Sequence, residues 1–329
     1  MNILIVGGGV AAFEAAVAAR KQSADCSITI CSAENVPPYR RPALPGLIFA
    51  DDEELARIFI RKESFYAENR IELRLNMRLT AVDPQKHEAV FNDETRLPYD
   101  KLILATGGYA FVPPVPGREL DTVLTLRTLE DLKILRARLK AGAGNVVIIG
   151  GGILGLEIAD ALLRSGAAVS VLENADRLLS RNISPEDSRW MMGKLEQIEN
   201  FKLICCASTR EITPQGVVLE DGRVIPGDLV IFSTGSRPVL AGIPQEIAVD
   251  RGILVDSHMQ SSLPDIYACG DNAQFKDSVC GLYTTARAMA AIAGNCAAGG
   301  NDEYIPKQNN IMLNTLGFKM SNDGKVTEK

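Results

Sequence analysis

The chain has 329 residues, of which 46% are hydrophobic, so it is long enough for roughly two or three domains with substantial apolar cores. A formal net charge of −6 argues against nucleic acid as a partner, and the longest apolar runs are too short to cross a membrane. The chain begins with a strand pattern rather than a signal peptide, and its seven cysteines have no metal-site pattern, which is typical of a cytoplasmic protein. With only two histidines, His87 and His258, a metal site is not expected.

The first predicted elements are a buried strand over residues 3–6 and an alanine-rich helix, joined by the glycine-rich turn of residues 7–12. Such a turn is a dinucleotide fingerprint, because the glycines allow close approach of a pyrophosphate and the helix N-terminus offers unpaired N–H groups. Glu34 ends the next predicted strand at about the spacing, ~20 residues, of a carboxylate that binds an adenosine ribose. The alternative for Glu34 is a solvated acid in a turn.

Two cysteines in the second predicted strand, Cys26 and Cys31, have the Cys-x4-Cys spacing of a redox disulfide. On a strand their Cα atoms would be about 16 Å apart, whereas a disulfide needs roughly 7 Å or less. These two cysteines are therefore not expected to bridge. The remaining cysteines, which are expected to be small buried hydrophobic residues, are Cys205, Cys206, Cys269, Cys280 and Cys296.

Basic residues follow the acidic run of residues 51–54. Arg57 and Arg61 are spaced i, i+4 and would share one face of a helix, which gives this acidic chain a local basic patch. The alternative is a solvated helix surface on which the charges balance.

A second fingerprint, residues 150–155, follows the strand pattern of residues 146–149. Glu173 ends the next predicted strand, where a carboxylate accepts from both ribose hydroxyls and repels a 2′-phosphate, so NADH is favoured over NADPH. Arg177 is the counter-argument, because a nearby arginine can bind that phosphate. Residues 100–107 are echoed by residues 228–235, so the chain contains two similar nucleotide-binding folds.

Four segments together resemble the FAD-dependent pyridine nucleotide oxidoreductases, the two-dinucleotide-binding flavoproteins: residues 7–12, 99–107, 150–157 and 262–271. Residues 38–44, Pro-Tyr-Arg-Arg-Pro-Ala-Leu, are similar to a segment of rubredoxin and ferredoxin reductases and of the flavin part of NAD(P)H nitrite reductases. The resemblance implies an α/β fold with two Rossmann-like (three-layer ββα) dinucleotide-binding domains, the NAD domain inserted in the FAD domain. The implied boundaries are 1–111 and 240–300 for the discontinuous FAD-binding domain, 112–239 for the NAD(H)-binding domain, and 301–329 for a truncated, partial C-terminal interface segment.

The resemblance also implies cofactor-binding residues and no metal. Those for FAD are Gly7, Gly9, Val10, Ala11, Ala12, Glu34, Arg41, Leu79, Ala105, Thr106, Gly107, Gly270, Asp271, Leu282 and Tyr283, and those for NAD are Gly150, Gly152, Ile153, Leu154, Gly155, Glu157, Glu173 and Gly235. Arg41 would add a cation beside the FAD diphosphate, and the helix that starts near Leu282 would direct its N-terminus at the flavin pyrimidine edge. Asp271 would accept from the ribitol chain, with a helix N-cap as the alternative.

Glu157 is the one candidate catalytic residue, and the resemblance implies that it faces the flavin–nicotinamide junction. A plain surface acid on a helix is the alternative. Reductases of this kind usually carry Ser-Lys after Pro-x-Leu, and that lysine can pair with the acid that corresponds to Glu157. Here the two residues are Pro45 and Gly46, so Glu157 would lack that partner.

The implied activity is electron transfer from NADH through FAD to a small electron carrier, rubredoxin or ferredoxin. The charge pattern makes the basic patch of Arg57 and Arg61 the candidate docking surface for an acidic carrier. The position of the redox disulfide in related enzymes, around Ala43 and Leu44, has no cysteine, so the electrons would leave for an external acceptor. Two alternatives stay open: an electron-input flavin module of a nitrite reductase or NADH oxidase, and, from another class, a non-catalytic FAD-binding subunit.

Overall fold

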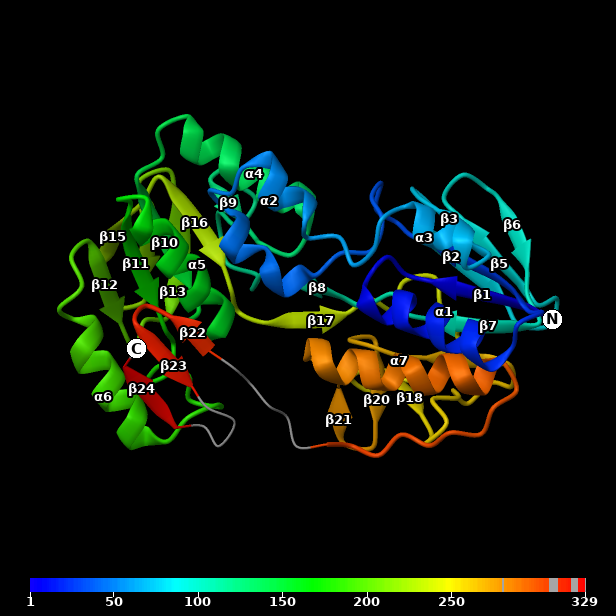
Figure 1. Ribbon diagram of the computed structural model, residues 1–329. Helices are drawn as coiled ribbons and strands as arrows, with labels where there is room; N and C mark the ends of the chain where they lie inside the picture. Colours follow the sequence, from blue (N-terminus) through cyan, green and yellow to red (C-terminus); the bar gives the residue numbers. More distant parts are fainter. Residues whose placement is uncertain (280, 308–312, 321–324, 329) are drawn as a thin grey trace. The chain divides into compact units, whose positions relative to one another are not determined.

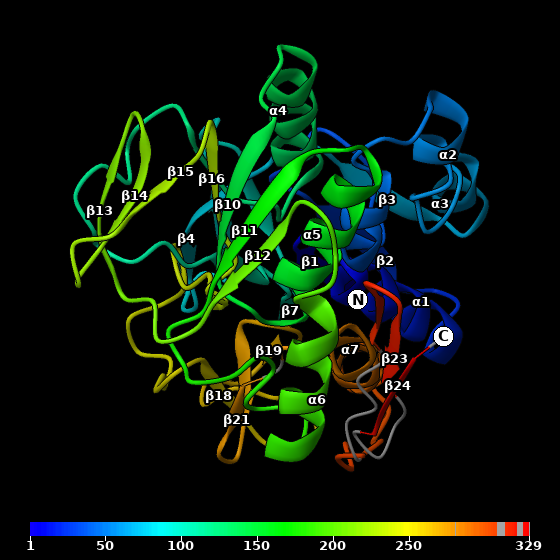
Figure 2. The ribbon, with the colours of Figure 1, turned by 90° about the vertical axis from the view of Figure 1, so that its left-hand side faces the viewer.

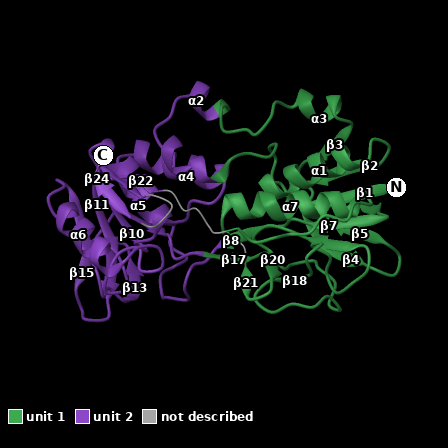
Figure 3. Ribbon diagram, turned by 60° about the horizontal axis from the view of Figure 1, so that its bottom comes forward, with its two compact units in different colours: residues 1–41, 56–109, 236–308 green, residues 42–55, 110–235, 309–329 purple. Residues whose placement is uncertain are grey.

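The structure, a computed structural model, describes residues 1–279, 281–307, 313–320 and 325–328. The chain forms two compact units, which Figure 3 colours separately. Unit 1 comprises Met1–Arg41, Ala56–Tyr109 and Ser236–Gln308, and unit 2 comprises Pro42–Leu55, Ala110–Gly235 and Asn309–Lys329.

Unit 1 is built on a five-stranded parallel sheet in the order β19-β7-β1-β2-β3. Its strands are β1 (Asn2–Val6), β2 (Ser27–Cys31), β3 (Ile71–Arg74), β7 (Lys101–Leu104) and β19 (Ile266–Ala268). Helices α1 (Val10–Gln22) and α7 (Tyr283–Ala297) run side by side (Figure 1). Small residues permit this contact, because a Cβ atom on Gly294 would come 2.1 Å from the carbonyl oxygen of Ala15.

Smaller elements complete unit 1. They are helix α3 (Ser64–Glu68), the antiparallel sheet of β4 (Leu79–Asp83), β5 (Glu88–Phe91) and β6 (Arg96–Pro98), and the sheet of β18 (Ile253–Val255), β20 (Ala273–Phe275) and β21 (Ser278–Val279). Strand β8 (Gly108–Ala110) pairs with β17 (Ser236–Pro238), where the chain leaves and re-enters unit 1. Val82, Ala89 and Phe91 share one apolar core with β1, β7, α1 and α7. Unit 1 is therefore layered as two sheets and a helical layer.

Unit 2 repeats this plan with a parallel sheet in the order β12-β11-β10-β16-β9. Its parallel strands are β9 (Val123–Leu124), β10 (Asn145–Ile149), β11 (Ala168–Leu172), β12 (Phe201–Ile204) and β16 (Leu229–Phe232). Its helices are α4 (Leu129–Lys140), α5 (Ile153–Arg164) and α6 (Pro185–Leu195), and its antiparallel sheet has β13 (Thr209–Thr213), β14 (Gly216–Leu219) and β15 (Val224–Pro226). Strands β10, β11 and β12 lie side by side (Figure 2), and α5 packs against β10 and β11. The expected α/β class is confirmed in both units.

Two further segments belong to unit 2. The first contains the 3-10 turn η2 (Pro45–Leu47) and most of the short helix α2 (Asp52–Ala56), after the turn η1 (Arg41–Ala43). The second is a C-terminal antiparallel sheet of β22 (Leu313–Thr315), β23 (Phe318–Met320) and β24 (Val326–Glu328). Phe318 packs in one cluster with Leu156 and Met191, and the Thr315 hydroxyl donates to the Leu156 carbonyl oxygen at 3.2 Å. The described part of the C-terminal segment thus supports α5 and α6.

Candidate functional site

The glycine-rich turn of unit 1 lies at the carboxyl edge of its parallel sheet. Val6, the last residue of β1, pairs with Cys31 on one side and Leu104 on the other, so the turn adjoins the ends of β2 and β7. A Cβ atom on Gly7 would come 2.0 Å from the carbonyl oxygen of Ala105, and the φ angle of Gly7 is 151°. Only glycine fits there. Three segments predicted to bind FAD therefore converge at this edge: the turn, the end of β2 and the end of β7.

The N-terminus of α1 has the features of an anion site. The N-cap residue of helix α4 is Thr128, whose hydroxyl accepts from the Asp131 N–H. The N-cap residue of α1 is Gly9, which provides no side-chain cap, and the first turn of α1 has no acid. The nearest heavy atom to a Cβ on Gly9 would be Arg41 Nε at 4.0 Å. Free helix N–H groups, open space and a nearby guanidinium fit a diphosphate.

Glu34 and Arg41, both predicted to bind FAD, contact each other in the structure. The Arg41 guanidinium pairs with one Glu34 carboxylate oxygen, and the hydroxyl of Tyr39 donates to the other at 2.8 Å. Arg41 Nη1 also donates to that hydroxyl at 3.0 Å. Tyr39 is buried and fixes both charged groups near the end of β2. Tyr39 was not among the residues predicted to bind FAD, although it lies in the Pro-Tyr-Arg-Arg-Pro segment that also contains Arg41.

The remaining FAD predictions lie on the neighbouring elements of unit 1. A Cβ on Gly270 would come 3.0 Å from the Ala11 side chain, so the turn after β19 that carries Asp271 lies against the first turn of α1. The next element after Asp271 is strand β20, so Asp271 is not the N-cap residue of a helix, which was the alternative role for it. Thr106 lies in the chain between Ala105 and Gly107, which are also predicted to bind FAD, and its hydroxyl donates to the Val239 carbonyl oxygen at 2.8 Å. Leu79 is buried at the start of β4, and α7 starts after Leu282 without a side-chain cap, with Tyr283 in its first turn.

The second fingerprint has the same construction in unit 2. A Cβ on Gly150 would come 2.4 Å from the Ser233 carbonyl oxygen, and one on Gly155 would come 2.1 Å from the Gly150 carbonyl oxygen. A Cβ on Gly152 would meet no heavy atom within 4 Å. Helix α5 starts there without a side-chain cap or an acid in its first turn, which contains Ile153 and Leu154. Gly235 follows β16 with a φ angle of 97°. This edge also fits the diphosphate of a dinucleotide.

Glu173 stands beside this turn, as its position after β11 predicts. Its carboxylate accepts from the N–H of Gly151 and from the N–H of Ala175, each at 2.8 Å. Arg177 is engaged elsewhere, because its Nη2 donates to the Ser180 carbonyl oxygen at 3.2 Å. The geometry therefore places a carboxylate, and not a guanidinium, against the glycine turn.

Glu157 lies on α5 within a partly buried environment. Burial raises the pKa of its carboxyl from 4.5 to about 7, and the nearby Asp160 adds to this rise. The turn η2, which contains Pro45 and Gly46, packs against α5. In the part of the chain that the structure describes, Glu157 has no hydrogen bond or ion pair, so its carboxyl is partly protonated near neutral pH.

The cysteines are free thiols in the described residues. Cys26 and Cys31 are both buried, and burial raises the pKa of the Cys31 thiol to about 12. Cys269 and Cys296 are buried as expected, and Cys280 lies outside the described residues. The expectation is wrong for Cys205, which is half-buried, and for Cys206, which is exposed. Both follow the end of β12, where the chain leaves the covered part of the sheet.

The expected helix face with Arg57 and Arg61 is also wrong. Helix α2 ends at Ala56, and the chain turns at residues 57–58. Phe59 then forms an antiparallel bridge with Tyr39, in which the Ile60 N–H donates to the Pro38 carbonyl oxygen at 3.1 Å. Pairing with residues 38–40 replaces the helix. The Arg61 guanidinium lies 5.5 Å from the centre of the Phe65 ring. Both arginines are exposed on unit 1.

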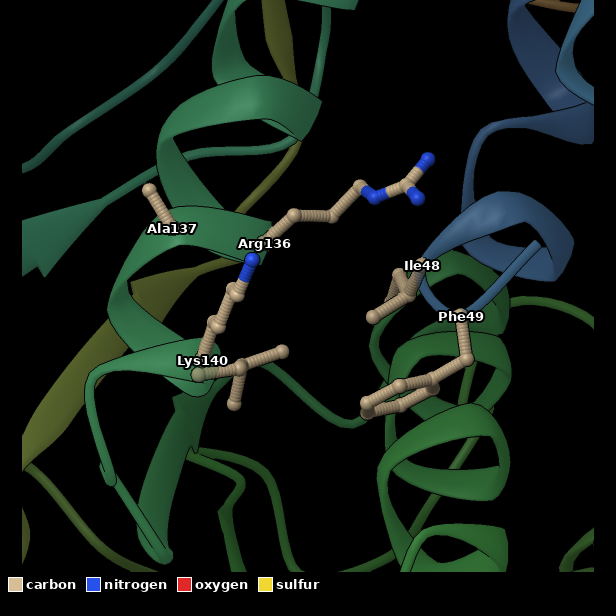
Figure 4. A pocket seen from close by; sticks show the side chains of 6 residues that line it. Ile48, Phe49, Arg136, Ala137 and Lys140 are labelled. Atoms are coloured by element: carbon tan, nitrogen blue, oxygen red, sulfur yellow. The ribbon is translucent and has the colours of Figure 1, made fainter. Parts of the chain in front are cut away.

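Other kinds of site have less support. Among the described residues, no group of three or more His, Cys, Asp or Glu side chains could hold a metal ion. A search of the same residues finds no helix with the length and apolar character of a membrane span. A surface pocket of about 360 Å³ in unit 2 is lined by Ile48, Phe49 and residues of α4, including Arg136 (Figure 4). Its lining includes none of the residues predicted to bind FAD or NADH.

The fold and the two glycine-rich turns define a two-dinucleotide-binding flavoprotein of the reductase type. The chain belongs to the pyridine nucleotide-disulphide oxidoreductase family, which it matches over residues 1–290. Family membership implies FAD and NADH as cofactors, and the uncapped helix N-termini of both units fit them.

Relatives and solved structures agree with this assignment. The chain is 36% identical to the rubredoxin-NAD(+) reductase of Pseudomonas putida over 278 residues, which cover 83% of this chain and 72% of the relative. It is 32% identical to the NADH-rubredoxin oxidoreductase of Clostridium acetobutylicum over 326 residues, 99% of this chain and 82% of the relative. The crystal structure of NADH:rubredoxin oxidoreductase from that organism matches with a TM-score of 0.85 at 32% identity, over 97% of this chain and 81% of that one. A ferredoxin reductase from Rhodopseudomonas palustris matches with a TM-score of 0.88 at 28% identity, over the same shares.

Proposed function

We propose that the protein is an NADH-dependent FAD oxidoreductase that passes electrons from NADH through flavin to a small electron-carrier protein, rubredoxin or ferredoxin. The observation that carries this proposal is the pair of glycine-rich turns, one in each unit, each leading into a helix whose N-terminus has no side-chain cap. Relatives that are 36% and 32% identical and named for electron transfer between NAD and rubredoxin support the choice of carrier.

Unit 1 holds FAD in this proposal. The N–H groups of residues 9–12 bind the diphosphate with Arg41 beside them, and Glu34 accepts from the adenosine ribose. Asp271 accepts from the ribitol chain, and the N-terminus of α7 offers its positive dipole end to the flavin pyrimidine edge. The other residues proposed to contact FAD are Gly7, Leu79, Ala105, Thr106, Gly107, Gly270, Leu282 and Tyr283.

Unit 2 holds NADH. The N–H groups at Gly152 and the first turn of α5 bind its diphosphate, and Glu173 accepts from the adenosine ribose hydroxyls. When both cofactors are bound, nicotinamide supplies a hydride to flavin, which passes the electrons on. The protein contributes orientation and electrostatics. Cys26 and Cys31 carry no electrons in this proposal; both are buried, and burial raises the pKa of the Cys31 thiol.

The carrier docks on unit 1 at a basic cluster of Arg40, Arg57, Arg61 and Lys62, which are all exposed. The Arg40 guanidinium donates to the Arg57 carbonyl oxygen, so the first two members are adjacent. Because the chain as a whole is acidic, a local basic cluster is what an acidic iron carrier needs for an oriented encounter.

Reduction and reoxidation of the flavin test the proposal in two stages. Anaerobic NADH should bleach the flavin, and oxidised rubredoxin or ferredoxin should restore its colour. Carrier turnover should fall steeply with ionic strength, whereas ferricyanide reduction, which needs no oriented docking, should change less. The double variant Arg57→Glu/Arg61→Glu should reproduce the loss at low salt, and Arg138→Glu, an exposed arginine of unit 2, is the matched control.

Two outcomes would contradict the proposal. If NADH leaves the FAD-loaded protein oxidised, a non-catalytic FAD-binding subunit is the better description. If turnover is independent of salt with every iron protein tried, or if O₂ alone reacts efficiently, the carrier and its docking surface are wrong.

A further inference from the structure

Two adjacent thiols lie on the nucleotide-binding edge of unit 2. Leu172 and Ile204 are partners in the parallel pairing of β11 and β12, so Glu173 and Cys205 follow the ends of neighbouring strands. Cys205 is half-buried and Cys206 is exposed. A vicinal pair of accessible thiols therefore stands beside the carboxylate proposed to bind the NADH ribose.

The loop that carries these thiols is bonded to the Glu173 loop. The N–H of Ala207 donates to the Glu173 carbonyl oxygen at 2.9 Å, and the N–H of Cys206 donates to the Ala175 carbonyl oxygen at 3.0 Å. The Glu173 carboxylate in turn accepts from the N–H groups of Ala175 and Gly151. A continuous set of hydrogen bonds thus joins the thiol loop to the glycine turn.

The local environment favours one kind of thiol chemistry. Burial, followed by the charge of Glu173, raises the pKa of the Cys205 thiol to about 11, so a thiolate is scarce and alkylation at neutral pH is slow. The φ angle of Cys206 is 51°, a left-handed conformation that is uncommon for a non-glycine residue. Two cysteines that are adjacent in the chain can offer both sulfur atoms to one soft centre.

We propose that Cys205 and Cys206 form a vicinal dithiol site for trivalent arsenicals, and that occupation of this site excludes NADH from unit 2. The second part rests on the proposed function, in which unit 2 binds NADH. An organic arsenic(III) oxide reacts with two thiols to form two As–S bonds. The two S–H bonds and the arsenic–oxygen double bond break, the oxygen leaves as water with both protons, and arsenic stays trivalent. The bulky group then lies beside Glu173 and disturbs the contact of its carboxylate with Gly151.

The experiment uses the full FAD-loaded chain and phenylarsine oxide as the probe. Intact-mass spectrometry should show one phenylarsenic group per chain, removed by the dithiol 2,3-dimercaptopropanol but not by 2-mercaptoethanol. Calorimetry with NAD⁺, which does not reduce the flavin, should show a Kd at least about tenfold higher after modification, equivalent to about 1.4 kcal/mol. The flavin absorbance should not change, because FAD binds in unit 1.

Variants of the thiols separate this site from the other cysteines. Cys205→Ala/Cys206→Ser should bind NAD⁺ like the unmodified chain and resist the reagent. Should that double variant fail to fold, Cys206→Gly serves instead, because glycine accepts the left-handed backbone without strain. Cys296→Ala, a thiol of unit 1, is the matched control and should react like the unaltered protein.

The possible results separate the two parts of the inference. Absence of the adduct, or equal uptake by the double variant, would overturn the dithiol site. An adduct on the pair that leaves the NAD⁺ Kd unchanged would overturn its coupling to nucleotide binding. If the unmodified chain takes up arsenic but binds neither NAD⁺ nor NADH, the proposed function fails and the coupling with it, while the dithiol site stands.

Discussion

Replacement of Glu157 by Gln should make the stability of the protein less dependent on pH. The pKa of the Glu157 carboxyl is raised from 4.5 to about 7, mainly by burial. Between these two values the folded state keeps a proton that the unfolded state has lost, so the free energy of unfolding falls as pH rises. The full shift would correspond to a destabilisation of about 3 kcal/mol above pH 7, and solvent screening at a partly exposed helix reduces this to about 1–2 kcal/mol.

Thermal unfolding of the FAD-loaded protein at pH 5 and pH 8 measures this effect. Glu157→Gln should unfold close to the unaltered protein at pH 5 and at a temperature roughly 2–5 °C higher at pH 8. Asp160→Asn removes the like charge that also raises the pKa of Glu157, so it should shift stability in the same direction by less. If the unfolding temperatures of Glu157→Gln and the unaltered protein differ by the same amount at pH 5 and pH 8, the reasoning is refuted.

A lysine at position 46 provides a second test of the same carboxyl. A Cβ on Gly46 would meet no heavy atom within 4 Å, and η2 packs against α5, the helix that carries Glu157. Gly46→Lys should supply the missing cation, lower the pKa of Glu157 and stabilise the protein at pH 8. The gain should disappear in the Glu157→Gln background, because the substitutions would act through one pair.

Three further predictions concern the cofactors. Glu173→Ala should raise the KM for NADH by roughly tenfold or more, since a charged hydrogen bond contributes about 1.5–3 kcal/mol. The same variant should prefer NADH over NADPH by a smaller factor than the unaltered enzyme does. If the unaltered enzyme has the higher kcat/KM for NADPH, Arg177 determines the choice of nucleotide. Asp271→Ala should weaken FAD binding, measured as flavin released on dilution, and a colourless unaltered protein that resists reconstitution would contradict the site. Cys26→Ser and Cys31→Ser should each retain most of the acceptor reduction. Anaerobic NADH titration of the unaltered protein should show about two electrons per FAD and no long-wavelength thiolate–flavin band. Loss of turnover in either variant with flavin still bound would show that the replaced cysteine carries electrons.

The sequence was sufficient for the features that depend on local chemistry. The backbone at Gly7 has a positive φ angle and passes close to Ala105. Glycine is the residue that accepts both conditions, so the fingerprint can be recognised in the sequence. The strands that flank it are buried on both faces, so they appear as short unbroken apolar runs. Glu34 and Glu173 were predicted from their spacing to the fingerprints and their positions after a strand. The structure places the Glu173 carboxylate on the Gly151 N–H. It pairs Glu34 with Arg41, whose Nε would lie 4.0 Å from a Cβ on Gly9.

Tertiary pairing explains what the sequence analysis missed. Arg57 and Arg61 have helical spacing, but the chain turns at residues 57–58 and Phe59 bridges to Tyr39, so no helix forms between the two arginines. The role of Tyr39 depends on Glu34 and Arg41 meeting in space, and no local pattern records that contact.

The wrong prediction that Cys206 is buried also arises from its place in the tertiary structure. Cysteine is usually a small buried residue, and this residue type alone was the basis for expecting burial. Strand β12 ends at Ile204, however, and beyond it the chain enters the open carboxyl edge of the sheet, where ligands of α/β proteins bind. A side chain beyond the end of the strand is not covered by the helices that pack against the strand itself. The two errors in predicted burial, Cys205 and Cys206, thus lie at the edge where NADH binding is proposed, and an exposed thiol there is a better candidate for chemistry than its residue type alone suggests.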